Sequence, residues 1–213
     1  MRRVRNLAGK NQGFTIVELL VALAVFSVVL VVVTAAIIQV SRVYYKGVTE
    51  ASVQDTARNI MDTVSQSIQF GGGTVTDTVS SPSPGTSYDF CINNQEYSYR
   101  PGYQLVDGTP NASLHQTNYS LVVRTVAACS SPTGQDLSGA VSGRELLAPN
   151  MRLANMVVKN VGPNLYQVQV RVVYGDDDLL NNPTTSTAAC KGVAGRQFCA
   201  VSDLSTVVIS RVQ

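Results

Sequence analysis

The chain has 213 residues, enough for one or two ordinary domains. Hydrophobic residues make up 45% of it, but charged residues only 14%, against roughly 25% in a typical soluble protein. This composition argues against a disordered chain, a coiled-coil rod and a highly charged nucleic-acid-binding domain. Four of the 16 basic residues precede Gly13, with no acid among them, so the remainder has 12 basic and 14 acidic residues and a net charge of −2. The rest of the chain therefore has no excess of basic residues with which to bind DNA nonspecifically.

A long apolar run dominates the N-terminal part of the chain. Residues 19–38 contain no Lys, Arg, Asp, Glu or His. A helix of that length spans about 30 Å, the thickness of the hydrocarbon core of a bilayer. The basic flank precedes the run, which favours a cytoplasmic N-terminus and places the rest of the chain outside. Cleavage of an ordinary signal peptide after residues 34–36, Thr-Ala-Ala, is the alternative.

Glu18 lies at the N-terminal edge of this run. An ionised carboxylate inside hydrocarbon costs about 2.5 kcal/mol or more, so such a residue usually has a partner. The simpler alternative is a carboxylate that only reaches the lipid headgroups. The surrounding residues 10–20 closely resemble the processing site of type IV prepilins and pseudopilins. The features in common are a basic leader, a Gly13-Phe14 junction, a Glu four residues after Phe14 and an uninterrupted apolar run.

The resemblance implies a role for each of these residues. Gly13 would be the last residue of a leader that a prepilin peptidase removes, and Phe14 the new, N-methylated terminus. Glu18 would pair with the N-terminal amine of a neighbouring pilin subunit, because two groups that are costly to bury singly become tolerable as a pair. Other pilin subunits, the peptidase and a pilus assembly platform are the implied partners, and the chain would pass from the cytoplasmic membrane to a cell-surface pilus.

Four regions are expected along the chain: a leader at 1–13, a transmembrane and assembly helix at 14–40, its amphipathic continuation at 41–70, and an extracytoplasmic β-rich pilin domain at 71–213. Apolar residues recur at helical spacing through the third region, and glycines at 71–73 end it. A single helix over 14–70, of about 85 Å, is therefore predicted. Its predicted apolar face consists of Val40, Val43, Gly47, Ala51, Ala57, Met61, Val64 and Ile68.

The remaining chain predicts a loop and then strands. Residues 74–85 are rich in Thr, Ser, Pro and Gly, as is typical of a loop. Alternating apolar residues predict the clearest strand over 165–174, and Asn93 and Asn94 separate two strands of an expected hairpin. The predicted strands are 87–92, 95–100, 119–126, 155–160, 165–174 and 203–212, with 146–152 ambiguous. A helix followed by antiparallel strands predicts an α+β fold, pilin-like by resemblance.

Four cysteines lie in the expected external part, where an even number favours disulfides. Three pairings are possible, and we favour Cys91 with Cys129 and Cys190 with Cys199. The second pair closes a C-terminal loop of the kind that many pilins have. Zinc is disfavoured, because the chain has one His and no C-x-x-C motif.

Little in the sequence indicates catalysis or a cofactor. The chain has no nucleophile elbow, P-loop or dinucleotide-binding fingerprint. His115 lies in a polar segment and is expected to be solvated. The acids at 176–178 suggest calcium as an alternative, but their spacing does not match an EF-hand, and a solvated turn is favoured. We therefore predict no catalytic residue, no metal site and no cofactor.

The leading hypothesis is a structural subunit of a type IV pilus. Many major pilins carry a proline within the apolar helix; here there is none from Phe14 to Lys46, which favours a minor pilin or a pseudopilin over a major pilin. A pseudopilin of a type II secretion or DNA-uptake system is the alternative. A tip-located adhesin or DNA-binding pilin is another, although nucleic-acid binding has no direct support. The candidate surface for such binding is an aromatic group: Tyr88, Phe90, Tyr97, Tyr99 and Tyr103. The alternative, which is the more common one for tyrosines that alternate along strands, is that they pack on their own sheet.

Overall fold

The computed structural model describes residues 13–127, 129, 135–139, 141–192 and 195–211. It divides into two compact units, one ending at Arg42 and one beginning at Val43. Nearly all of the predicted leader, residues 1–12, and the last residue of the predicted C-terminal strand lie outside the described residues. The described chain has one long helix and antiparallel-rich β-sheets, which confirms the predicted α+β, pilin-like architecture.

Helix α1 is Ile16–Phe70, so it begins two residues later than predicted and ends where expected. Its part in the first unit is built from Val, Ala, Leu and Ile, with no Gly or Pro to interrupt the backbone hydrogen bonds. The two hydroxyls of the apolar run bond back to the preceding turn. Ser27 Oγ donates to the Ala24 carbonyl at 2.8 Å, and Thr34 Oγ1 to the Leu30 carbonyl at 2.9 Å.

In the second unit, one face of α1 is buried against the sheets. The buried residues are Val53, Ala57, Ile60, Met61, Val64 and Ile68. The prediction was right from Ala57 onward but missed Val53 and Ile60. Val40, Val43, Gly47 and Ala51 are exposed, because the core covers the helix only from Val53. The helix ends where Gly72 and Gly73 adopt positive φ angles of 62° and 84°, as the glycine run predicted.

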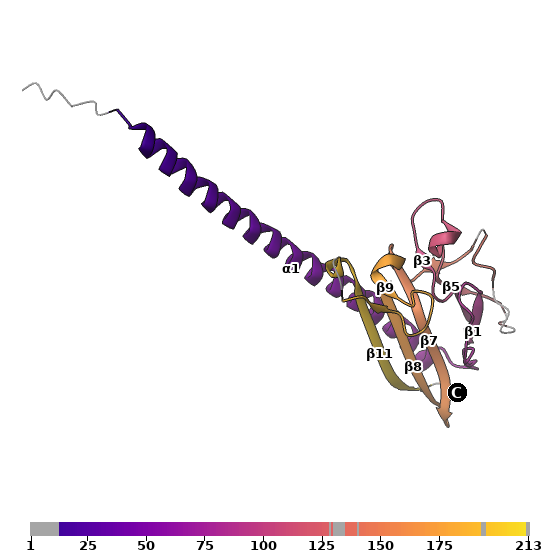
Figure 1. Cartoon of the computed structure of the whole chain (residues 1–213). Coiled ribbons are helices and arrows are strands. Elements are labelled where there is room, and N and C mark those ends of the chain that lie inside the picture. The colour runs from indigo at the N-terminus through magenta and orange to yellow at the C-terminus, as the bar shows by residue number, and fades with distance from the viewer. Residues whose placement is uncertain (1–12, 128, 130–134, 140, 193–194, 212–213) are drawn as a thin grey trace, which may run out of the picture. The chain divides into compact units, whose positions relative to one another are not determined.

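A five-stranded sheet has the order β11-β8-β7-β3-β4, and its three long strands run side by side (Figure 1). The strands are β3 Gln104–Leu105, β4 Gln116–Thr117, β7 Met151–Gly162, β8 Leu165–Tyr174 and β11 Ala200–Ile209. Strand β8 has the predicted bounds, whereas β7 begins four residues before the predicted strand. Strand β11 is shifted three residues toward the N-terminus relative to prediction, because it pairs with the whole of β8 from Ala200.

A second sheet has the order β1-β2-β5-β6, and β9 and β10 form a small antiparallel pair. The strands are β1 Tyr88–Ile92, β2 Gln95–Tyr99, β5 Leu121–Thr125, β6 Arg144–Glu145, β9 Leu180–Asn181 and β10 Ala189–Cys190. The predicted β1–β2 hairpin through Asn93 and Asn94 is confirmed. The two-residue strands were not predicted, because two residues are too few to show an alternating pattern.

The predicted loop before β1 ties the two sheets together. Val75 forms an antiparallel bridge with Ile92 of β1. The Thr78 backbone N–H donates to the carbonyl of Val158 in β7 at 2.9 Å, and the Val158 N–H donates to Thr78 Oγ1 at 3.0 Å. These bonds hold the segment along the sheet edges, so it has a fixed course although it contains no regular strand.

A buried acid on β1 makes stability pH-dependent. Asp89 is 4% exposed. Burial, and secondarily the charge of Glu96, raise the pKa of Asp89 from 3.8 to about 6. The positive charge of Arg124, which donates to Glu96 at 2.7 Å, lowers this pKa only in part. The folded chain thus holds this proton more tightly than the unfolded chain. The stabilisation of the folded state that comes from holding this proton is complete below about pH 4 and is lost as the pH rises through about 6.

Asp89→Asn is therefore expected to raise the free energy of unfolding at pH 7.5 by an amount on the order of 1–3 kcal/mol. At pH 4 the same substitution is expected to change it little, because the native carboxyl is then protonated. Thermal unfolding of the detergent-solubilised chain at both pH values measures this. Asp55→Asn, at an exposed position of α1, is the control. An equal shift at both pH values would refute the prediction.

Candidate processing and assembly site

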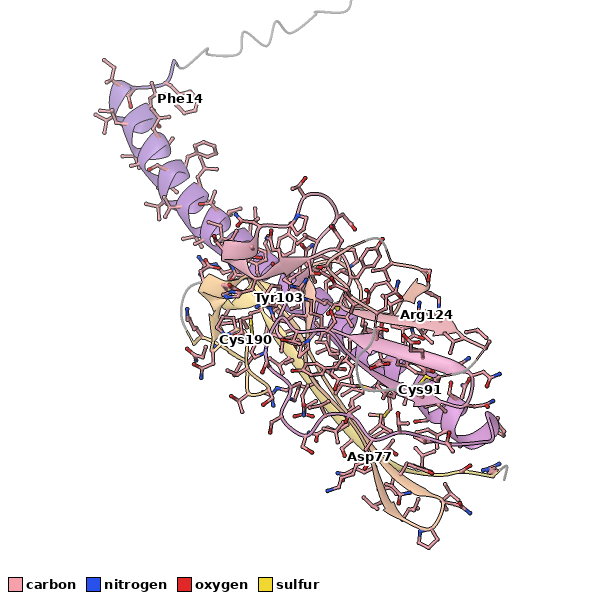
Figure 2. The ribbon with its side chains drawn as sticks, turned by 90° about the vertical axis from the view of Figure 1, so that its right-hand side faces the viewer. Phe14, Asp77, Cys91, Tyr103, Arg124 and Cys190 are labelled. Atoms are coloured by element: carbon pink, nitrogen blue, oxygen red, sulfur yellow. A yellow bond between two sulfur atoms is a disulfide. The ribbon has the colours of Figure 1, made fainter. Side chains whose placement is uncertain are left out.

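The predicted processing residues stand just before helix α1. Gly13 and Phe14 have irregular backbone, and the Phe14 side chain is 85% exposed. Figure 2 labels Phe14 at the start of the helix. The Gly13–Phe14 peptide bond therefore lies outside regular secondary structure, as access by a peptidase requires.

Thr15 and Glu18 form a capping box at the start of α1. The Glu18 N–H donates to Thr15 Oγ1 at 3.3 Å, while the N–H and hydroxyl of Thr15 both donate to Glu18 Oε2 at 3.0 Å. This reciprocal arrangement satisfies backbone donors that the first turn leaves free. The T-x-x-E pattern before an apolar run signals a capping box, but this one was not predicted. Glu18 thus holds the helix start as well as carrying a charge.

The first part of helix α1, which follows the capping box, is exposed in the monomer. Every residue from Gly13 to Val40 is exposed. The helix contains a stretch that is long and apolar enough to cross a membrane, by length and composition. A contiguous apolar surface of this extent is rare on a soluble monomer and needs lipid or other helices around it. The first unit is therefore built for a nonaqueous environment.

The four cysteines form two disulfides. Cys91 of β1 is joined to Cys129, with 6.0 Å between their Cα atoms, and Cys190 of β10 is joined to Cys199, with 5.8 Å. These are the pairings that the sequence analysis favoured. Figure 2 shows Cys91 and Cys190 in different parts of the β-rich unit. The first bridge fixes the chain after β5 to β1, and the second closes a nine-residue separation just before β11.

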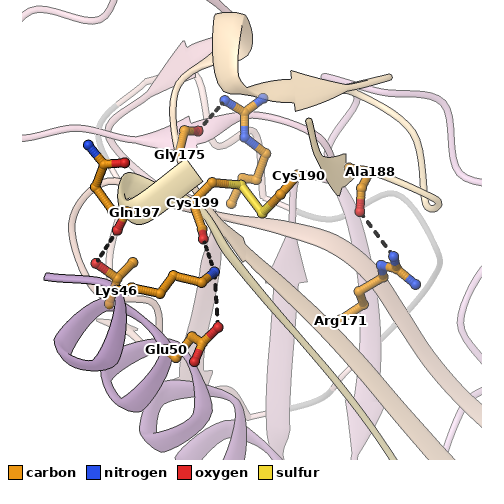
Figure 3. Close-up of a disulfide and its surroundings, with 10 residues drawn as sticks. Lys46, Glu50, Arg171, Gly175, Ala188, Cys190, Gln197 and Cys199 are labelled. Atoms are coloured by element: carbon orange, nitrogen blue, oxygen red, sulfur yellow. Dashed lines mark hydrogen bonds and ion pairs between the residues drawn. A yellow bond between two sulfur atoms is a disulfide. The ribbon is translucent and has the colours of Figure 1, made fainter. Parts of the chain in front are cut away.

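The second disulfide holds its loop against helix α1 (Figure 3). Lys46 Nζ donates to the Cys199 carbonyl at 2.7 Å and forms an ion pair with Glu50 at 2.9 Å. Thr49 Oγ1 donates to the Gln197 carbonyl at 3.4 Å. The loop is thus fixed at three points, by its covalent bridge and by two side chains of the helix.

Most of the aromatic group packs in the core, as the alternative interpretation expects, and does not form a binding surface. Phe90, Tyr97 and Tyr99 are fully buried, and the Phe90 and Tyr97 rings stack with centroids 4.9 Å apart. Tyr88 is half-buried beside them. Tyr103 has a different environment, with the Arg100 guanidinium 4.5 Å above its ring. Alternation in β1 and β2 sends these rings into the core, so they stabilise the fold and offer no common surface.

His115 and the acidic turn also differ from expectation. The turn is the short 3-10 helix η2, Asp177–Leu179. Asp177 Oδ1 forms an ion pair with the buried guanidinium of Arg152 at 2.7 Å, and Asp177 Oδ2 lies 2.6 Å from His115 Nδ1. Asp176 Oδ1 accepts a hydrogen bond from Gln104 Nε2 at 2.9 Å. His115 is therefore partly buried and paired, not solvated. Among the described residues, no group of three or more His, Cys, Asp or Glu is arranged to hold a metal.

Comparison with known proteins agrees with the geometry at the N-terminus. The prokaryotic N-terminal methylation motif matches residues 9–34. No curated protein and no solved structure matches the chain. The matched segment contains Gly13, Phe14, the capping box and most of the exposed apolar run, and the family that carries the motif is structural, not enzymatic. Residues 9–34 are therefore a type IV prepilin signature, on a chain that is type IV pilin-like in architecture.

Proposed function

We propose that the chain is a subunit of a type IV pilus and has no reaction of its own. The observation that carries the proposal is the match of the methylation motif to a helix start whose apolar residues are all exposed. In this proposal, residues 1–13 are a leader removed by a prepilin peptidase, and residues 14–40 anchor the subunit in the cytoplasmic membrane. Residues 41–70 and 71–213 form the extracytoplasmic domain.

Assembly would exchange lipid for neighbouring helices around the apolar run. The exposed helix offers a continuous apolar surface for that purpose, and an assembly platform would extract it from the bilayer. Glu18 would meet the methylated amine of Phe14 from a neighbouring subunit, because a charge entering an apolar filament core needs a partner. The helix carries no proline, which supports a minor subunit.

The N-terminal residue and mass of the native protein test this proposal. We expect methyl-Phe14 at the start and both disulfides intact, in protein from membranes and from sheared filaments. We also expect it to be far less abundant in the filaments than their main subunit. A start close to Ala36 would instead mean ordinary signal cleavage and would contradict the filament assignment. A Phe14 start without any filament-bound protein would contradict the pilus assignment and favour a pseudopilus.

A further inference from the structure

Four exposed apolar side chains gather at the beginning of the second unit. Three belong to α1, and the fourth belongs to the 3-10 helix η3, Arg196–Phe198, inside the second disulfide loop. We call them the Tyr44–Phe198 patch: Tyr44, Tyr45, Val48 and Phe198, which are 67%, 52%, 50% and 46% exposed. The Tyr45 ring lies 6.0 Å from that of Tyr44 and 5.8 Å from that of Phe198, centroid to centroid. The three rings are therefore contiguous.

The fold holds Phe198 in this position. Cys199, the next residue, is fully buried and disulfide-bonded, and its carbonyl accepts from Lys46. The carbonyl of Gln197, the preceding residue, accepts from Thr49 (Figure 3). The backbone on both sides of the ring is thus bound to helix residues that lie one and four positions after Tyr45. An apolar ring that is fixed outside the core, beside two exposed tyrosines, indicates a contact with something outside this chain.

Chain connectivity places the patch close to the end of the apolar run. Tyr44 lies six positions after Ile38, and these six steps set the distance between them. They advance about 9 Å as helix, and cannot extend beyond about 20 Å in any conformation. The polar interfacial layer on each side of a bilayer is several ångströms thick, and tyrosine is enriched there because its ring is apolar and its hydroxyl is wet. Tyr44 and Tyr45 therefore fall within reach of this layer, whatever the angle between the two units.

We propose that the Tyr44–Phe198 patch binds the headgroup layer of the outer leaflet while the subunit is in the membrane before assembly. The disulfide loop then holds the β-rich unit against the lipid. The inference rests on the membrane anchoring that is proposed above. Four side chains are far fewer than the 20–30 residues per partner of a stable protein interface, which favours lipid over a second copy. Assembly would separate the patch from the lipid. The lost contact between patch and headgroups would add to the free energy that is needed to extract the subunit from the membrane.

Tryptophan fluorescence tests the proposal directly, because the chain contains no tryptophan of its own. Phe198→Trp is compared with Phe70→Trp in the full chain, in vesicles of phosphatidylcholine and phosphatidylglycerol that contain no other protein. Phe70 is 61% exposed and lies 26 residues beyond Tyr44 on the same helix, or about 39 Å. Lipids brominated in the upper acyl chain are expected to reduce Phe198→Trp emission about twofold and to leave Phe70→Trp unchanged.

A third variant, Leu30→Trp, reports on the anchor, and it is measured with lipids brominated deep in the acyl chain because Leu30 lies near the middle of the apolar run. Quenching at Leu30→Trp without quenching at Phe198→Trp would overturn the lipid contact and leave the anchoring intact. No quenching at Leu30→Trp would refute the anchoring, and the lipid contact with it. Equal quenching at Phe198→Trp and Phe70→Trp would overturn the proposal, because the whole unit would then lie on the surface. A Phe198→Trp blue shift that follows protein concentration instead of bromination would assign the patch to a second copy and also overturn it.

Discussion

Glu18→Gln is expected to reduce entry into filaments by about a hundredfold or more, while processing after Gly13 continues. Glutamine can serve as the second partner of a capping box, so the bonds with Thr15 are kept. The negative charge alone is lost, and the amine of the neighbouring subunit would then enter the apolar filament core unpaired. Removing one partner of a buried ion pair costs about 3–5 kcal/mol. The ratio of filament-bound to membrane-bound protein, by quantitative immunoblotting, measures the effect.

Thr15→Val is the matched control for this prediction. It removes the hydroxyl of the capping box and leaves the carboxylate of Glu18 in place. The loss of a cap costs about 1 kcal/mol at the helix start, so filament entry is expected to fall far less than in Glu18→Gln. If Thr15→Val blocks assembly and Glu18→Gln does not, the role of Glu18 is to hold the helix start, and the charge-pair mechanism is wrong.

Arg152→Met is expected to give a large loss of stability, about 3–5 kcal/mol in the free energy of unfolding. The Arg152 side chain is fully buried in β7. Its guanidinium donates to the carbonyls of Gly102, Gly175 and Pro183 at 3.1–3.3 Å and pairs with Asp177 at 2.7 Å. Methionine would leave three carbonyls and a carboxylate without that partner. Urea unfolding of the detergent-solubilised chain, followed by the near-UV signal of its tyrosines, measures the loss.

Arg171→Met provides the comparison, since it also removes an Arg–Asp pair. Arg171 bonds Asp203 at 3.0 Å and the Ala188 carbonyl at 3.0 Å, but the arginine and aspartate side chains are 23% and 38% exposed. Water replaces the lost partner at such a site, so a loss of about 1 kcal/mol is expected. Equal losses in the two variants would mean that burial does not decide the contribution of Arg152.

Local patterns in the sequence were sufficient for the elements whose contacts are local. Alternation along residues 165–174 predicted β8 at its observed bounds, and the glycine run after Phe70 predicted the end of α1. The prepilin signature is equally local, since Gly13, Phe14, Glu18 and the apolar run lie within one short segment. The capping box of Thr15 and Glu18 is equally local, since the T-x-x-E pattern signals it, but it was not predicted.

The sequence by itself thus determined the long helix, the main strands, the α+β class and the N-terminal signature, because each depends on residues a few positions apart. Only the tertiary structure decided which polar residues are buried and with which partners. His115 meets Asp177 across 62 positions, and Lys46 meets the Cys199 carbonyl across 153. Periodicity reports which face of an element is apolar but not which element will cover it. The burial of the β1 and β2 aromatics and the exposure of Phe198 follow from that covering, which arises only when the sheets and the helix pack together.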